Sequence, residues 1–477
     1  MKLSNPWIAM LLFAGMIGIA YLISRGGLMM AAGILALPPV LLYLNRLFVN
    51  PRIGLFTVLI LAFTAIGLTR YIQGVPFGLS IDIMLALTYL AVFFKFFYKK
   101  IDYTYIKSDL TLLALIWFLY AVLQFFNPEA LSQKAWFYAM RGMSLYPLLT
   151  IPLGFLLFDR LKYMNIFLYI WGVFTILATI KGWQQLYLGP DFAEQRWLDQ
   201  EGAVTHIIFG ELRVFSFYSD AGQFGAAQAA AGIAGLIIAL NVKGFKQKVF
   251  FWAMCLAGFY GMMLSGTRGA MIVPMIGGFV YIIHRKNVRV IIFGVLMLIA
   301  VYAFFRYTYV GQGNRFIRRM RTAFRPDETA SLQVRLENRR ILESYLRTRP
   351  FGGGIGSAGD WGRRFSPHGF LAQIPTDSWY VQIWAEQGIV GLILHLIILV
   401  YIAIKSSYII MFKLKDPVLR GKMSALVAAY IGIMGASYGN GVLGQMPTGI
   451  ITYLSWVFLF LSPKFDEEIR QLKEKNP

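Results

Sequence analysis

Arginines are concentrated in one long polar segment, and this is the most distinctive chemical feature of the chain. Residues 307–387 contain twelve arginines and no lysine, between stretches that are mostly apolar. Arginine is preferred to lysine where phosphate oxygens must be held in a fixed geometry, because its planar guanidinium donates two parallel hydrogen bonds and keeps its charge. The segment therefore indicates that the protein handles an anionic group, for which a diphosphate is a natural candidate.

Three more arginines, Arg141, Arg213 and Arg268, are isolated charges at the edges of apolar segments. A charge in such surroundings is costly, so arginines of this kind often mark a binding site. Each of them could instead extend its head group toward water or support a turn. Within the long segment, Arg335 is a further candidate for contact with a donor or an acceptor.

The elements that must position these residues are membrane-spanning helices. The chain has 477 residues, of which 58% are hydrophobic and 14% charged, and its mean hydropathy is +0.60. A bilayer core needs about 20 apolar residues for each helix. We therefore predict an all-α integral membrane protein of about fourteen (12–14) transmembrane helices with one large helical loop. The predicted spans are 7–23, 28–44, 53–72, 77–97, 109–126, 142–158, 164–187, 221–241, 249–265, 269–284, 288–306, 388–411, 421–439 and 446–462.

Lysine positions predict the orientation, because short cytoplasmic loops are rich in Lys and Arg. A cytoplasmic N-terminus places the basic clusters at 243–248, 285–289 and 413–422 inside and the segment 307–387 outside. Long loops cross the membrane largely regardless of charge, so arginines there are free to serve another purpose. The predicted organisation is a first part of the bundle at 1–306, an extracytoplasmic arginine-rich loop at 307–387, a second part of the bundle at 388–462 and a cytoplasmic tail at 463–477.

Two amphipathic helices are expected inside the long segment, at 314–324 and at 332–347. In the second helix several apolar residues fall near one face and most arginines lie off it. The expected apolar residues are Leu332, Leu336, Ile341, Tyr345 and Leu346. Pro350 then ends the helix.

Two other classes of function are disfavoured. The net charge of +22 suggests nucleic-acid binding, but the cytoplasmic lysines are explained by topology and by anionic lipids, and the remaining charge faces away from the cytoplasm. The single cysteine, Cys255, and four dispersed histidines make a metal site improbable. We expect no nucleic-acid partner and no metal.

Four motifs occur in an order and spacing that resemble the O-antigen ligase and polymerase superfamily. They cover roughly residues 205–395, and each is weak alone, but together they form a strong signal. They are RVFSFYSD at 213–220, LSGTRGA at 264–270, RTRPFGGGIG at 347–356, and TDSWYVQ at 376–382 followed by EQGIVGL at 386–392.

The resemblance implies a metal-independent, inverting C-type glycosyltransferase of the bacterial cytoplasmic membrane, with no cofactor and an extracytoplasmic active site. Such enzymes pass a glycan from an undecaprenyl-diphosphate donor to a glycan or lipid acceptor. In the family, arginines matching Arg213 and Arg268 hold the diphosphate, and a histidine acts near the acceptor hydroxyl. Membrane lipids are expected partners, and a chain-length regulator is a candidate partner.

This sequence departs from the family at that histidine, where Asp377 stands. A carboxylate can accept the acceptor's proton, so Asp377 is our first candidate for the general base. His368, nine residues earlier, is the alternative. The departure favours a polymerase or another branch over the lipopolysaccharide ligase.

Aromatic residues flank the predicted site and could stack on a sugar ring: Trp361, Trp379 and Tyr380. The rival function is a flippase or other transporter of lipid-linked oligosaccharide, which can have a similar number of helices and a cationic interior. A transporter should carry charges near the midplane of several helices. Here the charges gather at helix ends and in one outer segment, which favours chemistry at the membrane surface.

Overall fold

The structure is a computed structural model that describes residues 6–72, 74–98, 104–202, 206–208, 210–313, 315–321, 324 and 330–475. It forms two compact units, of which unit 1 comprises residues 1–54 and 86–100 and unit 2 comprises residues 55–85 and 101–477. Unit 1 holds helix α1 (Pro6–Val49), which is interrupted at Gly27, where φ is +59°. In unit 1 the rings of Phe48 and Phe94 lie 5.9 Å apart.

The fold is all-α, as predicted. Among the described residues, eleven helices are long and apolar enough to cross a membrane. These are Met30–Val49 in α1, Arg52–Tyr71 (α2), Gly78–Phe96 (α3), Asp109–Phe126 (α4 and η1), Gln133–Leu157 (α5, η2 and α6), Leu161–Tyr187 (α7), Ala221–Asn241 (α10), Phe245–Ser265 (α11), Trp379–Lys413 (α18 and η7), Pro417–Ala436 (α19) and Thr448–Lys475 (α20).

Shorter elements complete the described chain. Two of them, Arg268–His284 (η4 and α12) and Ile291–Tyr307 within α13 (Val288–Tyr307), are apolar helices at two further predicted spans. The first predicted span, 7–23, falls in the first part of α1, and the count of fourteen stays a prediction. The other elements are α8 (Phe192–Trp197), η3 (Leu198–Gly202), the antiparallel strands β1 (Ile207–Ile208) and β2 (Glu211–Leu212), α14 (Arg315–Arg321), α15 (Ala330–Leu346), α16 (Gly359–Phe365) and α17 (Phe370–Gln373).

Small residues let the central helices of unit 2 approach each other closely. Helix α10 is rich in Ala and Gly, and nearly all of it is buried. A Cβ atom on Gly258 of α11 would lie 2.5 Å from the backbone nitrogen of Gly232 in α10. Larger residues there would force the two helices apart, which is the role that small residues commonly have between membrane helices.

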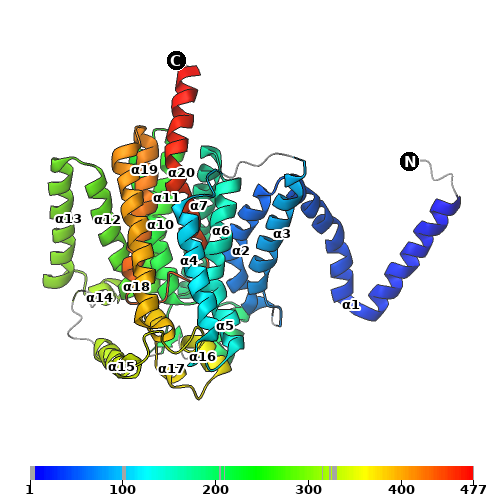
Figure 1. Ribbon diagram of the computed structural model, residues 1–477, viewed down its shortest axis with the longest axis horizontal. Helices are drawn as coiled ribbons and strands as arrows, with labels where there is room; N and C mark the ends of the chain where they lie inside the picture. Colours follow the sequence, from blue (N-terminus) through cyan, green and yellow to red (C-terminus); the bar gives the residue numbers. More distant parts are fainter. Residues whose placement is uncertain are drawn as a thin grey trace. The chain divides into compact units, whose positions relative to one another are not determined.

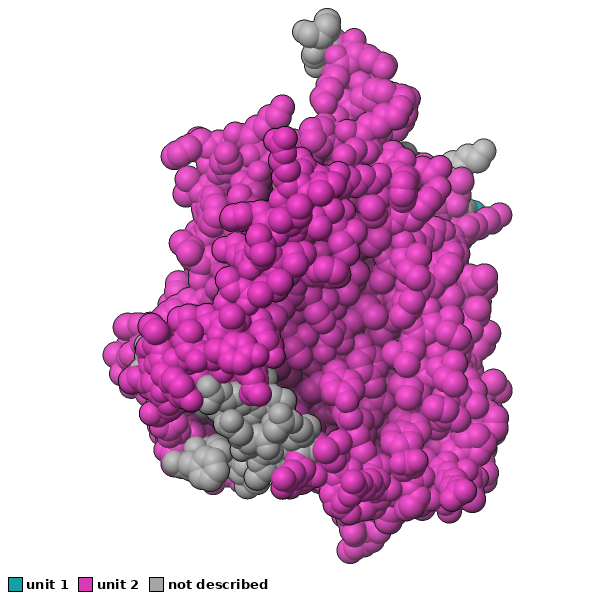
Figure 2. All heavy atoms as spheres, turned by 90° about the vertical axis from the view of Figure 1, so that its left-hand side faces the viewer, with its two compact units in different colours: residues 1–54, 86–100 teal, residues 55–85, 101–477 magenta. Residues whose placement is uncertain are grey.

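The arginine-rich segment lies at one end of unit 2. Helices α14 to α17 gather there, and the C-terminal part of α20 extends from the opposite end (Figure 1). Figure 2 shows unit 2 from the side on which α12 and α13 lie in Figure 1, and its surface is hollowed near the middle of that face. Both predicted amphipathic helices are present, as α14 and α15, with residues 314, 322 and 323 outside the described ranges.

Packing within unit 2 buries only part of the predicted apolar face of α15. Leu342 and Leu346 are buried in a small core with Leu371, Ile374 and other apolar residues of α16 to α18. Leu336 and Ile341 are instead exposed, and the side chain of Leu332 lies outside the described residues. A periodic pattern gives a helix's apolar stripe only approximately, and packing against α17 and α18 selects the residues that are buried.

Candidate active site

The glycine-rich turn and the EQG motif form one structural unit. The backbone N–H of Gly353 donates to the carbonyl of Ala385 (2.9 Å), and that of Val390 donates to the carbonyl of Pro350 (3.2 Å). Gly388 interrupts α18 with φ +67°, and a Cβ there would lie 2.0 Å from the Pro350 carbonyl oxygen. Only glycine fits this position, because it needs both a left-handed backbone and the missing side chain. The unit joins the end of α15 to the first turns of α18.

Asp377 lies directly before α18 and pairs with an arginine of α15. Its Oδ2 is 3.2 Å from Nε of Arg335. The next residue, Ser378, is the N-cap of α18 and donates its hydroxyl to the carbonyl of Ser437 (3.2 Å). Asp377 is thereby held at the boundary between α15 and the loop that follows α19.

A second arginine of α15 contacts the same loop. Arg339 Nη1 donates to the hydroxyl of Tyr438 at 2.6 Å, and its guanidinium lies 4.6 Å from the centre of that ring. Arg335, Arg339, Asp377 and Tyr438 together line a small depression. The depression combines two cations, one carboxylate and one phenol.

Arg213 lies in the loop between β2 and α10 and extends toward Thr267, the residue before Arg268. Its Nη2 is 3.5 Å from the Thr267 hydroxyl, and its Nε is buried with no hydrogen-bond partner among the described residues. Burial lowers the pKa of Arg213, Asp220 opposes this effect, and the charge of Arg268 reinforces it. An anion bound at this point would satisfy the unpaired donor and relieve the repulsion.

The LSGTRGA motif places Arg268 beside Arg213. Gly266 ends α11 in the left-handed conformation with φ +57°. Thr267 then donates its hydroxyl to the carbonyl of Ala221, the first residue of α10, at 2.8 Å. Arg268 begins η4, and its charge interacts with those of Arg213 and Arg335. The three arginines come from three distant segments and form one group, which we call the arginine cluster.

Two buried residues that were not predicted as site residues, Arg70 and Gln185, hold the loop that carries Arg213. Arg70, at the end of α2, donates Nη1 to the Ser216 carbonyl (2.8 Å) and Nη2 to the Tyr218 carbonyl. Its guanidinium lies 4.3 Å from the centre of the Phe215 ring. Gln185 of α7 accepts from the backbone N–H of Ser216 at 2.8 Å. Ser216 has φ +53°, a strained value for a non-glycine residue, and these contacts stabilise it.

The connection between α19 and α20 also contributes to the site, although none of its residues was predicted as a site residue. The predicted spans end at 439 and resume at 446, whereas α19 ends at Ala436 and α20 begins at Thr448, so residues 437–447 form a longer loop at the site. A Cβ on Gly269 would lie 2.6 Å from Asn440 Nδ2, so this loop packs directly beside Arg268. Gln445 Nε2 is 3.5 Å from Oδ2 of Asp220, the N-cap of α10. The Tyr-Gly-Asn-Gly sequence at 438–441 is typical of a loop and could have indicated it.

Two other predicted site residues, Arg141 and His368, have surroundings different from those of the arginine cluster. Arg141 begins the π-helical turn η2 and pairs with Asp82, with Nε 3.0 Å from Oδ1, and it also donates to the Tyr146 hydroxyl at 3.1 Å. His368 is exposed on the turn between α16 and α17, and its imidazole has no hydrogen-bond or ion-pair partner in the described part of the chain. No hydrogen bond or ion pair joins His368 with Asp377 among those residues.

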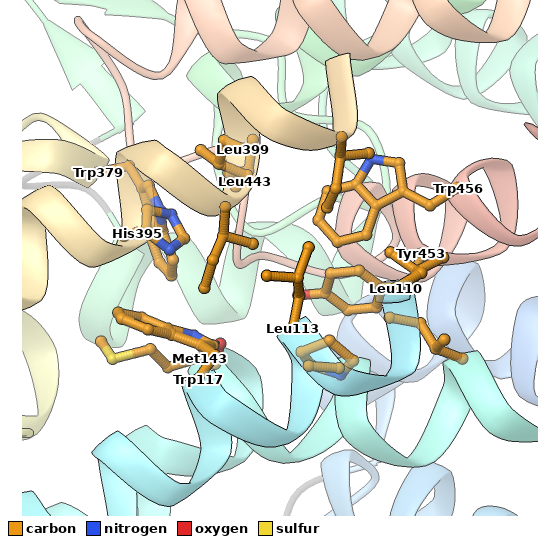
Figure 3. Close-up of a pocket in the computed structure, with 15 residues that line it drawn as sticks. Leu110, Leu113, Trp117, Met143, Trp379, His395, Leu399, Leu443, Tyr453 and Trp456 are labelled. Carbon is orange, nitrogen blue, oxygen red and sulfur yellow. The ribbon is translucent and has the colours of Figure 1, made fainter. Parts of the chain in front are cut away.

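The predicted aromatic residues have different surroundings. Trp361 stacks on Tyr138 with ring centres 5.1 Å apart. The Tyr380 hydroxyl donates to the Met434 carbonyl at 2.8 Å. Trp379 is buried, and its indole N–H donates to His395 at 2.9 Å. Trp379 and His395 lie together at one side of an apolar cavity inside the bundle, with Trp456 at the other side (Figure 3). This position favours a packing role for Trp379.

The fold and the site define an integral membrane protein of helices with a cationic site at one end of its bundle. Residues 249–396 match the family model described as O-antigen ligase. The match confirms the predicted resemblance to the O-antigen ligase and polymerase superfamily, and it supports surface-glycan processing of the ligase or polymerase type. It includes Arg268, the glycine-rich turn and Asp377, whereas Arg213 precedes it. No curated protein matches the chain.

Proposed function

We propose that the protein transfers a glycan from an undecaprenyl-diphosphate donor to an acceptor glycan or lipid at the outer face of the cytoplasmic membrane. The observation that carries this proposal is the arginine cluster of Arg213, Arg268 and Arg335 with Asp377 paired to one of its members. Three cations and one carboxylate match the two needs of the reaction. One need is a stabilised anionic leaving group, and the other is an acceptor for one proton.

Arg213 and Arg268 are assigned to the diphosphate. Each guanidinium can donate two parallel hydrogen bonds to phosphate oxygens. Without a donor, Nε of Arg213 has no hydrogen-bond partner among the described residues, and Arg213 is repelled by Arg268, although Asp220 offsets this repulsion. A bound diphosphate would supply the missing acceptor for Nε of Arg213 and would offset the repulsion between the arginines. Negative charge develops on the leaving oxygen as the glycosidic bond breaks, so the same contacts would strengthen in the transition state. No metal ion takes part in this proposal.

Asp377 is assigned as the general base. The acceptor hydroxyl oxygen attacks the anomeric carbon from the face opposite the diphosphate, and the bond from that carbon to the diphosphate oxygen breaks. The leaving diphosphate keeps the electron pair, and the hydroxyl proton moves to the Asp377 carboxylate. The configuration is inverted in one displacement. Arg335 orients the carboxylate through the 3.2 Å ion pair. Asp377 is favoured over His368 because its contacts place it with the cluster.

The assay for this function incubates purified full-length protein in nanodiscs with a labelled undecaprenyl-diphosphate oligosaccharide, with and without an added acceptor. Products are separated by size. A ladder that forms without acceptor identifies a polymerase, and a single larger product that requires acceptor identifies a ligase. A donor that stays unchanged with every glycan and acceptor tried would contradict the proposal and favour a transporter of the same lipid.

A further inference from the structure

A second cationic cavity lies at the opposite end of unit 2, away from the arginine cluster. It has a volume of about 250 Å³ and lies between α10, α12 and α19. Its polar lining consists of Asn241, Tyr281, His284, Arg285, Arg420 and Ser424. Helix α10 runs from the cluster at Ala221 to the cavity at Asn241. At 1.5 Å per residue this separation is roughly 30 Å, so the cavity is a separate site.

Arg420 is the main cationic donor of the cavity. Its Nη2 donates to the Leu414 carbonyl at 2.6 Å, which fixes the guanidinium against the chain before α19. Its Nε is buried and has no hydrogen-bond partner among the described residues. A buried, unpaired guanidinium nitrogen carries a desolvation cost that a bound acceptor would remove.

Arg285 lies at the exposed end of α12 and adds a second cation. Its Nη1 donates to the Asn241 amide oxygen at 3.1 Å. Inside the cavity, Nδ1 of His284 lies 3.2 Å from the Ser424 hydroxyl. Two guanidinium groups, an imidazole and hydroxyl groups therefore meet around one space.

No carboxylate is among the described residues that line the cavity. The acidic residue closest along the chain is Asp416, and its carboxylate is already used. It accepts from the backbone N–H groups of Val418 and Leu419 and pairs with Lys473 at 2.9 Å. The charge of Arg285 and Arg420 is therefore not neutralised by the protein at this point.

Topology alone does not explain this arrangement. The positive-inside rule requires basic residues near the cytoplasmic ends of helices, and exposed lysines such as Lys248 satisfy it. It does not require a buried arginine nitrogen beside a cavity. Basic pockets between helices on the cytoplasmic side are, however, suited to the phosphate head groups of anionic lipids.

We infer that this cavity binds a phosphate group, held by Arg285 and Arg420 with support from Ser424. The phosphate belongs either to an anionic lipid of the adjacent leaflet or to a soluble phosphate. The planar guanidinium groups suit phosphate oxygens in both cases. The site is independent of the proposed glycan transfer.

The test uses the delipidated full chain in neutral detergent and measures thermal unfolding and native mass spectra. Phosphatidylglycerol, phosphatidylcholine and inorganic phosphate are titrated separately. We expect saturable binding of phosphatidylglycerol or inorganic phosphate, weakened at least tenfold in Arg420→Gln and Arg285→Gln and unchanged in Lys248→Gln. Stabilisation by phosphatidylglycerol alone assigns the phosphate to a lipid, and stabilisation by inorganic phosphate as well assigns a general phosphate site.

Two results would overturn the inference. One is no preference for either anionic probe over phosphatidylcholine. The other is binding that is equal in wild type and both arginine variants. Arg285 is exposed and Arg420 is half-buried, so Arg285→Gln is expected to fold even if Arg420→Gln does not, and the test does not depend on one variant.

Discussion

Arg335 on α15 and Asp377 at the start of α18 form an ion pair, with Nε 3.2 Å from Oδ2. The two residues are 42 positions apart in the chain. The core of Leu342, Leu346 and Ala385 holds their helices together. The pair places a carboxylate beside a group of arginines.

Asp377→Asn should remove the general base while keeping the size of the side chain. Positioned general bases contribute about 10²–10⁴-fold to rate, so kcat for glycan transfer should fall by that order. His368→Ala should remain close to wild type, because the His368 imidazole has no hydrogen-bond or ion-pair partner among the described residues. Single-turnover kinetics with labelled donor measure both variants. Loss of activity in His368→Ala with retention in Asp377→Asn would reverse the assignment.

Arg335→Gln should affect catalysis far more than stability. The side chains of Arg335 and Asp377 are about half exposed, at 41% and 51%, and ion pairs near the surface contribute at most about 1 kcal/mol. The Tm should therefore change little, while kcat should fall about 10-fold or more because Asp377 loses its orientation. Arg335→Lys should restore part of kcat with little change in KM. A change confined to Tm would show that the pair is only structural.

Arg70→Leu should loosen the loop that carries Arg213. The substitution removes a donor from the Tyr218 carbonyl and one of two donors from the Ser216 carbonyl, which keeps Gln185 Nε2 at 3.1 Å, and an unsatisfied buried group costs about 1–3 kcal/mol. We expect a lower Tm and faster hydrogen exchange at 213–219, with weaker donor binding. Leu68→Ala, on the exposed side of the same helix, is the control. Unchanged hydrogen exchange at 213–219 in Arg70→Leu would show that Arg70 does not stabilise this loop.

The same loop should be destabilised at acidic pH through His206. Its ring nitrogens lie 3.0 Å from the Gly202 carbonyl and 3.2 Å from the Ser219 carbonyl. Burial lowers the pKa of His206 from its ordinary value of 6.5. The unfolded chain therefore takes up this proton at a higher pH than the folded chain. Stability is lost as the pH falls below 6.5 toward the folded-state pKa.

His206→Gln removes this titration and serves as the matched comparison. Between pH 7.5 and 5.5 the wild type should lose more Tm than the variant, and hydrogen exchange at 213–219 should rise more steeply. Parallel curves for the two proteins would show that His206 does not contribute. Other titrating groups affect both proteins alike, so the difference between the curves is the quantity of interest.

Much of this architecture follows from local sequence. Runs of apolar residues predicted nearly all of the long helices, and the four motifs selected the glycine-rich segment and the residues around Asp377. These signals are local, since a helix needs only a continuous apolar stretch and a left-handed turn needs a glycine. Arg213 and Arg268 were selected because a single charge next to an apolar segment is unusual.

Hydrogen-bond and ion-pair partners that are distant in sequence could not be predicted from local sequence. Arg70 resembled an ordinary basic residue at a helix end until its contacts with Ser216 and Tyr218 were known. Arg141 was selected as an isolated charge, yet its guanidinium forms an ion pair with Asp82. Such pairings depend on how helices distant in sequence pack together. Leu342, which was not among the predicted apolar residues of α15, is buried for the same reason, because packing decides which apolar residues are buried.

The central claim is that Arg213 and Arg268 bind the donor diphosphate. The most direct measurement is binding of a labelled undecaprenyl-diphosphate oligosaccharide to wild type, Arg213→Gln and Arg268→Gln in nanodiscs, together with its transfer. Arg46→Ala, an exposed arginine of unit 1, is the control. We expect each cluster variant to weaken donor binding and abolish transfer while its Tm stays close to wild type and the control stays active. Full transfer by both cluster variants would contradict the account.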